Sequence, residues 1–248
     1  MQESAHLPTP RWSRVLLKLS GEAFAGDGTH GVIDYGAVAN LAGEVARLHA
    51  MGVQIAIVVG GGNVMRGTEA EKAGMERVTA DYIGTLGTVV NALALQDSLE
   101  QRGIDTRVQT AVPIQAVAEP YIRRRALRHL EKNRVVILAG GTGNPFFTTD
   151  TASALRASEV HADAVLMAKN GTDGVYDKDP RKFHDAVKFD RISYQDAIER
   201  QLRVMDLTAL TFCMENNIPI VVFDINVPDN ILRVAAGAAI GTLVTSQA

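Results

Sequence analysis

Three short apolar runs of this chain each lead into a turn that contains glycine. Residues 15–19 precede Ser20-Gly21-Glu22, residues 55–59 precede Gly60-Gly61-Gly62-Asn63, and residues 135–138 precede the segment Ala-Gly-Gly-Thr-Gly-Asn-Pro-Phe-Phe-Thr-Thr-Asp at 139–150. Apolar runs of this length, bounded by turn residues, are typical of buried strands. Because ligands bind at the carboxyl ends of the strands in open parallel sheets, we expect the three turns to converge on one site.

The alternation of strands with helices continues along the whole chain. Asp34 is expected to cap a helix that presents one apolar face and stops at Gly52, and residues 79–102 form a longer helix with an apolar stripe wide enough to meet a partner subunit as well as the core. Further strands are expected at 107–112, 164–168, 219–223 and 242–245, and further helices near Ile122, Ser193, Asp206 and Pro228. This order predicts an α/β fold, a three-layer αβα sandwich with a mostly parallel sheet.

The domain prediction is a flexible N-terminal tail at residues 1–13, which lack periodicity, followed by a single domain at residues 14–248. Within the domain, a gentle division is expected near residue 165.

Composition and charge exclude several classes of protein. A chain of 248 residues with 46% hydrophobic residues and a net charge of -3 has neither the bias of a disordered protein nor the broad basic field of a nucleic-acid binder. No apolar run approaches a membrane span, so we expect a cytoplasmic protein without nucleic-acid or membrane partners. Cys213 is the single cysteine, which excludes an intrachain disulfide and a multi-cysteine metal site, and it is expected to be buried. An arginine cluster at 123–125 is either a solvated helix face or an anion or subunit contact.

The turn at 139–150 has the properties of half a phosphate site. Its glycines let backbone N–H groups approach a ligand, and Thr148, Thr149 and Asp150 lie at the expected helix start, where the helix dipole favours an anion. An ordinary capped strand-to-helix loop has a similar composition. The prediction of a phosphate site therefore depends on the other two glycine turns lying beside this one. The chain has no G-x-x-x-x-G-K-[ST] motif, no complete G-x-G-x-x-G and no protein-kinase motif set.

Three charged residues stand out beside these turns. Lys18 interrupts an apolar strand, so its ammonium must either reach the sheet edge or meet an anion. Arg66 can fork onto phosphate oxygens or can be a surface arginine, and Asp150 can hold lysines in position, contact Mg²⁺ through water, or simply cap a helix. Such groups suit phosphoryl transfer, which needs positive charge and in-line positioning rather than a covalent nucleophile. The later segment 169–180, with glycines and Tyr176, suits a loop that stacks on a base, although exposed turns look similar.

These residues resemble the amino-acid-kinase family and, within it, the branch of bacterial uridylate kinases. The matching segments are residues 17–22, 60–63 with Arg66-Gly67, 141–150, 173–176 with Asp179-Pro180, and 204–207. The resemblance implies transfer of the ATP γ-phosphate to UMP, giving UDP in pyrimidine nucleotide biosynthesis, with Mg²⁺ accompanying ATP and no metal ligand on the chain.

Residue by residue, the resemblance assigns three groups. Catalytic roles fall to Lys18, Arg66 and Asp150. ATP contacts fall to Lys18, Leu19, Ser20, Gly21, Gly62, Arg66, Asn170, Tyr176 and Asp179. UMP contacts fall to Gly61, Asp81, Thr142, Gly143, Asn144, Pro145, Phe146, Phe147, Thr148 and Thr149.

The resemblance also implies a homohexamer, with GTP as an activator and UTP as an inhibitor. The loop linked to GTP would be Gly26, Asp27, Gly28, Thr29, His30 and Gly31. Gln96 and Glu100 stand where some relatives carry basic residues, so GTP activation stays open. Two other functions also remain open: a sister kinase for another small acceptor, and a non-catalytic nucleotide-binding protein used for storage or sensing.

Overall fold

The computed structural model describes residues 7–26, 28 and 31–247. The main sheet has nine strands in the order β4-β3-β5-β2-β1-β6-β10-β11-β9. These strands are β1 (Arg14–Leu19), β2 (Gln54–Val59), β3 (Thr106–Thr110), β4 (Glu119–Pro120), β5 (Val135–Ala139), β6 (Ala164–Lys169), β9 (Arg191–Ser193), β10 (Ile220–Asp224) and β11 (Thr242–Thr245). A separate antiparallel pair consists of β7 (Val175–Tyr176) and β8 (Lys188–Phe189).

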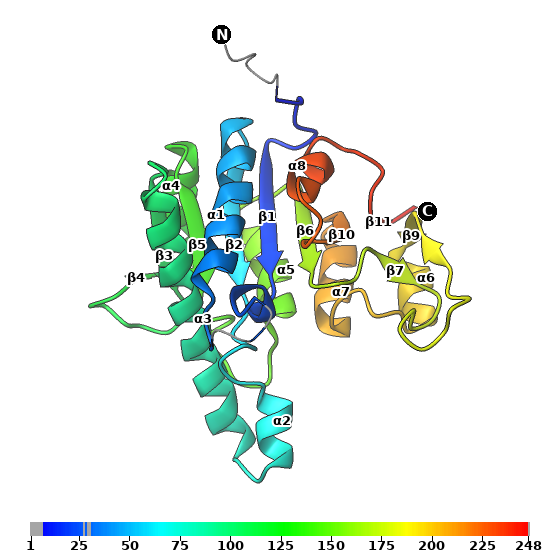
Figure 1. The fold of residues 1–248 in the computed structure, drawn as a ribbon, viewed down its shortest axis with the longest axis horizontal. Coiled ribbons are helices and arrows are strands. Elements are labelled where there is room, and N and C mark those ends of the chain that lie inside the picture. Colours follow the sequence, from blue (N-terminus) through cyan, green and yellow to red (C-terminus); the bar gives the residue numbers. More distant parts are fainter. Residues whose placement is uncertain (1–6, 27, 29–30, 248) are drawn as a thin grey trace.

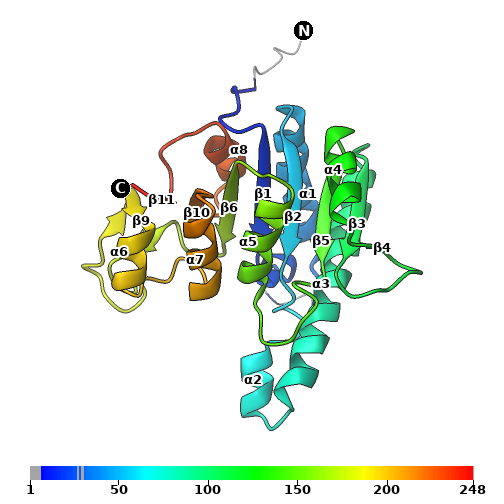
Figure 2. The same cartoon turned by 180° about the vertical axis from the view of Figure 1, so that it is seen from behind.

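Helices cover both faces of the sheet, as Figures 1 and 2 show from opposite sides. They are the 3₁₀ turn η1 (Gly21–Phe24) and helices α1 (Tyr35–Ala50), α2 (Gly67–Lys72), α3 (Arg77–Glu100), α4 (Arg123–Glu131), α5 (Thr149–Glu159), α6 (Tyr194–Glu199), α7 (Leu207–Glu215) and α8 (Asn230–Ala235). Helices α1, α3 and α8 pack on one face, and α4, α5 and α7 pack on the other. The predicted three-layer αβα sandwich is confirmed. Its sheet is mostly parallel, with β11 antiparallel to β10.

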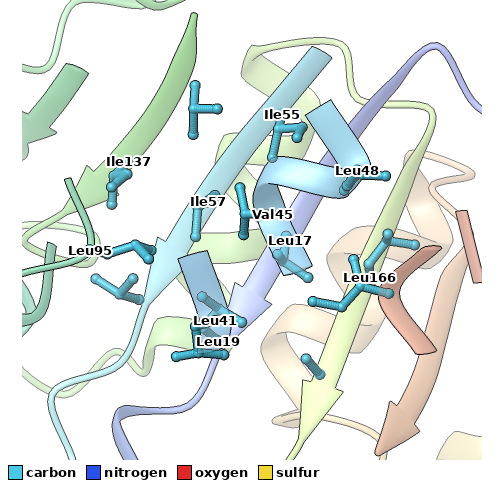
Figure 3. Close-up of a cluster of buried hydrophobic side chains, with 14 of the residues drawn as sticks. Leu17, Leu19, Leu41, Val45, Leu48, Ile55, Ile57, Leu95, Ile137 and Leu166 are labelled. Carbon is cyan, nitrogen blue, oxygen red and sulfur yellow. The ribbon is translucent and has the colours of Figure 1, made fainter. Parts of the chain in front are cut away.

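Two hydrophobic cores lie on the two faces of the sheet because successive side chains of a strand point in opposite directions. In β1, Leu17 and Leu19 point toward α1, whereas Leu16 points toward the opposite core. Figure 3 shows the first core, where Leu41, Val45 and Leu48 of α1 lie over the side chains of β1 and β2. Burying each such aliphatic side chain contributes about 1.5–3 kcal/mol. Because the central strands are buried on both faces of the sheet, their sequences are continuous apolar runs.

The point where the chain changes direction across the sheet lies between β1 and β6. From β1 the chain moves to β2 on one side, and after α5 it returns to β6 on the other side of β1. In an open parallel sheet this arrangement leaves a crevice at the carboxyl ends of the two strands. Both views show α2 and the first half of α3 projecting beyond those strand ends (Figures 1 and 2).

Several sequence predictions need correction at their boundaries. The long helix runs from Arg77 rather than residue 79, and the last helix begins at Asn230 because Asp229 has a left-handed φ of 65°. Helix α2, a helix of six residues in a polar segment, is not predicted from the sequence. Residues 1–6 of the predicted tail lie outside the described residues. From Arg11 the chain already contacts the domain, since its N–H donates to Ala235 O at 2.7 Å.

Helix α3 is the only helix in the described chain that is long and apolar enough to cross a membrane by length and composition. Its buried residues pack on the sheet beside α1, as expected for a core helix. An exposed apolar row, Tyr82, Leu86 and Val90, follows one side of the helix at four-residue spacing. The predicted wide apolar stripe is therefore present.

Candidate functional site

The turns after β1 and β2 pack directly against each other. A Cβ on Gly21 would lie 2.6 Å from Gly62 N, and a Cβ on Gly60 would lie 2.7 Å from Gly21 N. Any side chain at these two positions would push the turns apart, so both glycines are required for close backbone approach. The predicted convergence of the first two turns is therefore seen in the structure.

Helix α3 holds the second and third turns together. Gly140 N–H donates to Thr88 Oγ1 at 2.7 Å, and Phe146 N–H donates to Asp81 Oδ2 at 2.8 Å. Gly61 lies so close to the helix that a Cβ there would be 2.1 Å from Gly84 O. All three turns therefore meet at the carboxyl end of the sheet.

A cavity of about 130 Å³ lies between these turns and α3. The residues with predicted UMP or ATP contacts that line it are Gly61, Gly62, Asp81, Thr142, Asn144, Phe147 and Thr149. Four of the residues with predicted UMP contacts do not line it: Gly143, Pro145, Phe146 and Thr148. Sequence reasoning missed Ala80, Gly84 and Thr88, although small residues at this four-residue spacing share one face of a helix and could have indicated a close contact.

Lys18 forms an ion pair with Asp150, with 2.9 Å between Nζ and Oδ1. Lys18 shares the strand face of Leu16, and α5 packs on that face, so alternation along β1 carries the ammonium to the first turn of α5. Only 8% of Lys18 is exposed. The sequence expectation that this lysine meets an anion holds, and the anion in this structure is a side chain.

The start of α5 is fixed by Thr148, whose hydroxyl accepts hydrogen bonds from the N–H groups of Asp150 and Thr151 at 3.0 and 3.4 Å. The helix therefore begins at Thr149, within the segment 148–150 where its start is expected. Thr149 lines the first cavity and Asp150 lines another, so consecutive residues of this helix turn border the two cavities.

Lys169, at the end of β6, is a second, partly buried cation that sequence reasoning did not assign. Burial lowers the pKa of Lys169, and the positive charge of Lys18 lowers it further, while Asp150 and Asp206 act in the opposite direction. The alternation of β6 could have found it, because Lys169 is two residues beyond Met167, which pairs with Lys18.

Asp150 keeps its negative charge in this setting. Burial by itself raises the pKa of its carboxyl, but Lys18 and Lys169, with hydrogen bonds from Lys18 and the Asp206 backbone, hold that pKa below its usual range. The cluster thus holds one carboxylate between two ammonium groups, an arrangement suited to presenting positive charge to phosphate oxygens.

Arg66 lies apart from this ion pair. It pairs with Glu22, and with Glu69 at 3.3 Å, and its side chain passes 3.8 Å from the position of a Cβ on Gly62. Its side chain is 45% exposed. Arg66 therefore borders the first two turns without joining Lys18 and Asp150.

Two larger cavities adjoin the cluster of Lys18, Asp150 and Lys169, and Lys169 lines both of them. A cavity of about 440 Å³ is lined by Lys169, Tyr176 and Asp179, and it shares Lys169 and residues 201–203 with the cavity of about 580 Å³ that reaches Asp150. Tyr176 and Asp179 are thus brought together as expected.

Asn170 is not brought to the same hollow. It accepts a hydrogen bond from Asn226 at 2.7 Å and lines a separate cavity beside α1.

The remaining predicted residues belong to loops beside β1. The side chain of Leu19 is fully buried in the core, and Ser20 precedes η1. In the predicted regulatory loop, Gly26, Gly28 and Gly31 have positive φ angles of 59°, 80° and 90°. Asp27, Thr29 and His30 lie outside the described residues.

Comparisons with known proteins agree with this architecture. Residues 13–224 match the model of the amino acid kinase family. The chain is 59% identical over 237 residues to a protein from Pediococcus pentosaceus named uridylate kinase, covering 96% of this chain and 98% of the relative.

Solved structures give the same result. The chain is similar to a UMP kinase from Bacillus anthracis, with a TM-score of 0.92, 41% identity and coverage of 96% of this chain and 97% of that one. It is also similar to a UMP kinase from Ureaplasma parvum, with a TM-score of 0.89, 35% identity and coverage of 95% and 99%. The match of the family model and the identity along nearly the whole chain together show that the chain belongs to the amino acid kinase family.

Proposed function

We propose that the chain is a nucleoside monophosphate kinase that transfers the γ-phosphate of ATP to UMP, giving ADP and UDP. The observation that carries this proposal is that the first turn of α5 borders two cavities, at the place where Lys18 and Asp150 form their ion pair and Lys169 lies close by. The similarity to proteins named uridylate kinase supports UMP as the acceptor.

The charged cluster suits a reaction in which a phosphoryl group passes between two bound phosphates. Lys18 and Lys169 would neutralise the charge that spreads over the migrating group, and Asp150 would hold the two ammonium groups at a fixed separation. The backbone N–H groups of the glycine turns would hold the acceptor phosphate, and Tyr176 with Asp179 would hold the adenosine of ATP. Positioning by two rigid cavities supplies the in-line approach.

The proposed Mg²⁺ would be bound by ATP phosphate oxygens. Within the described part of the chain, no group of three or more His, Cys, Asp or Glu side chains is arranged to hold a metal. The Asp150 carboxylate is already paired with Lys18. A hard cation that keeps several waters and binds substrate phosphates fits this site better than a protein cage, and it would supply further neutralisation of phosphate charge.

Assembly and regulation are part of the same proposal. The exposed apolar row at Tyr82, Leu86 and Val90 would be covered by a second copy of the chain, within a homohexamer. GTP activation and UTP inhibition are proposed from family resemblance. The negative charge of Glu100 would repel a triphosphate bound beside it, and Arg107 partly offsets that charge, with 3.6 Å between Arg107 Nη1 and Glu100 Oε1. We place the enzyme in the cytoplasm and in pyrimidine nucleotide biosynthesis.

A non-catalytic nucleotide-binding protein is not favoured, since the complete charged cluster is retained. The test is nucleoside diphosphate formation from ATP and Mg²⁺ with UMP, CMP, dTMP, AMP or GMP, each with and without GTP. We expect turnover confined to UMP. Absence of turnover with every acceptor, together with measurable ATP binding, would refute the kinase proposal and support storage or sensing.

A further inference from the structure

Asp206 joins the starts of two helices, α5 and α7, that pack against each other beside the charged cluster. It is the N-cap residue of α7, where its Oδ1 accepts a hydrogen bond from Ala209 N–H at 2.8 Å. The same carboxylate accepts hydrogen bonds from two hydroxyls of the α5 start, those of Thr148 and Thr151. The Thr151 hydroxyl lies 3.1 and 2.9 Å from the two carboxylate oxygens.

The backbone of Asp206 adds a further link, because its N–H lies close enough to the carboxylate of Asp150 to lower the pKa of that carboxyl. One residue thus ties the first turn of α7 to the turn of α5 that carries both Thr149 and Asp150. Thr149 lines the proposed acceptor cavity, and Met205, the neighbour of Asp206, lines the hollow on the donor side.

A helix cap alone does not require these extra contacts. Asp34 caps α1 through Ala37 N–H at 2.7 Å, the same three-residue step that Asp206 makes to Ala209. Beyond its cap, Asp206 takes hydroxyl hydrogen bonds from a helix that begins more than fifty residues earlier in the chain. Hydrogen bonds to a charged acceptor are roughly twice as strong as neutral ones, so such a tie restricts movement of α5 relative to α7.

We propose that Asp206 is a positioning residue for phosphoryl transfer. It fixes the first turn of α5, and with it Thr149 and the Asp150 carboxylate, against the donor half of the site. Asp206 acts through Thr148, Thr151 and its own N–H, and it is not assigned a contact with either nucleotide. The inference rests on the proposed kinase function for its rate predictions alone.

The test uses four variants of the full chain: Asp206→Ala, Thr151→Val, the double variant, and Asp34→Ala as the matched cap control. Thr151→Val preserves side-chain shape and removes one hydroxyl tie without touching a predicted substrate contact. We expect kcat to fall roughly 10-fold in Thr151→Val and on the order of 100-fold in Asp206→Ala, since small misplacements in an active site carry losses of this size. The KM values for UMP and ATP should change by less than about threefold, because the tie acts on alignment rather than on binding.

The double variant should be no slower than Asp206→Ala, because both changes break the same tie. Asp34→Ala should lose thermal stability, as the other cap variant does, with kcat unchanged. Additive losses in the double variant, or an equal loss of kcat in Asp34→Ala, would overturn the proposal.

Hydrogen exchange of the protein without nucleotides provides a readout that needs no activity. The amides of residues 150–153 should exchange faster in Asp206→Ala and Thr151→Val than in the wild type, and at the wild-type rate in Asp34→Ala. Unchanged exchange in the first two variants would overturn the positioning role. A wild-type protein that phosphorylates no acceptor would refute the proposed function, and exchange would still decide whether Asp206 holds α5.

Discussion

Removing either partner of the Lys18–Asp150 ion pair should destabilise the protein by very different amounts. Asp150→Asn leaves the buried Lys18 and the partly buried Lys169 without their shared carboxylate. Lys18→Met leaves Asp150 with Lys169 and with the N–H of Asp206. The aspartate variant therefore leaves Lys18 without its ion-pair partner, and Lys169 keeps only the attraction of Asp206, whereas the lysine variant keeps a neutralised carboxylate.

The magnitudes follow from burial. The side chains of Lys18 and Asp150 are 10% and 17% exposed, so solvent screening is weak. Breaking a buried pair by removing one partner costs about 3–5 kcal/mol when the other charge is left unpaired, and we expect this for Asp150→Asn. For Lys18→Met we expect a loss nearer to about 1.5–3 kcal/mol, the range for one hydrogen bond to a charged group, reduced by the apolar methionine.

The assay is thermal unfolding followed by circular dichroism. For a chain of this size each kcal/mol shifts Tm by about 2–4 °C, so Asp150→Asn should fall by roughly 6–20 °C and Lys18→Met by less. The control is Lys188→Met, because Lys188 pairs with Asp173 at the same 2.9 Å but with side chains 32% and 50% exposed. An exposed pair contributes about 0–1 kcal/mol, so this variant should be almost as stable as the wild type.

Transfer activity separates the two roles of Lys18. Lys18→Met should lose roughly 10²–10³-fold in kcat while it stays folded, the loss typical for one donor that stabilises transition-state charge. Equal destabilisation by Asp150→Asn and Lys18→Met would refute the argument that Lys169 shares the carboxylate. A folded, active Lys18→Met would remove Lys18 from the proposed chemistry.

Three further predictions concern single residues. Burial lowers the pKa of Lys169 even though Asp150 opposes the shift, so kcat should decline as pH rises through that lowered pKa, and Lys169→Arg, which stays charged, should move the decline to higher pH in a pH–rate profile. Burial and the nearby Asp206 charge raise the pKa of Cys213 to about 12, so iodoacetamide at pH 8 should label the thiol only after unfolding; rapid labelling of the folded protein would contradict this. Gly61→Ala should lose about 1–3 kcal/mol in denaturant unfolding, because the added Cβ meets Gly84 O, whereas Gly43→Ala, with open space around it in α1, should be neutral or stabilising.

The sequence predicted the individual parts of the site better than their partners. Lys18 was identified because a charge inside an apolar strand must be compensated, and the structure compensates it. Lys169 and Asp206 were missed because each follows ordinary local rules, as the last residue of a strand and as a helix cap. Arg66 pairs with Glu22 and Glu69 in the structure, and the sequence alone does not indicate which of the nearby carboxylates it meets.

The sequence by itself determined the architecture: apolar runs of strand length, glycine turns and helical patterns repeat in an order that only a mostly parallel sheet covered on both faces can satisfy. These signals are local, since each depends on residues within a few turns of the chain. The tertiary structure alone decided which charges meet. Strand order placed β1 between β2 and β6, and this brought Lys18, Asp150 and Lys169 from three separate segments to one crevice. Electrostatic partners are set by distance in space, and that distance exists only after the two faces of the sheet have packed.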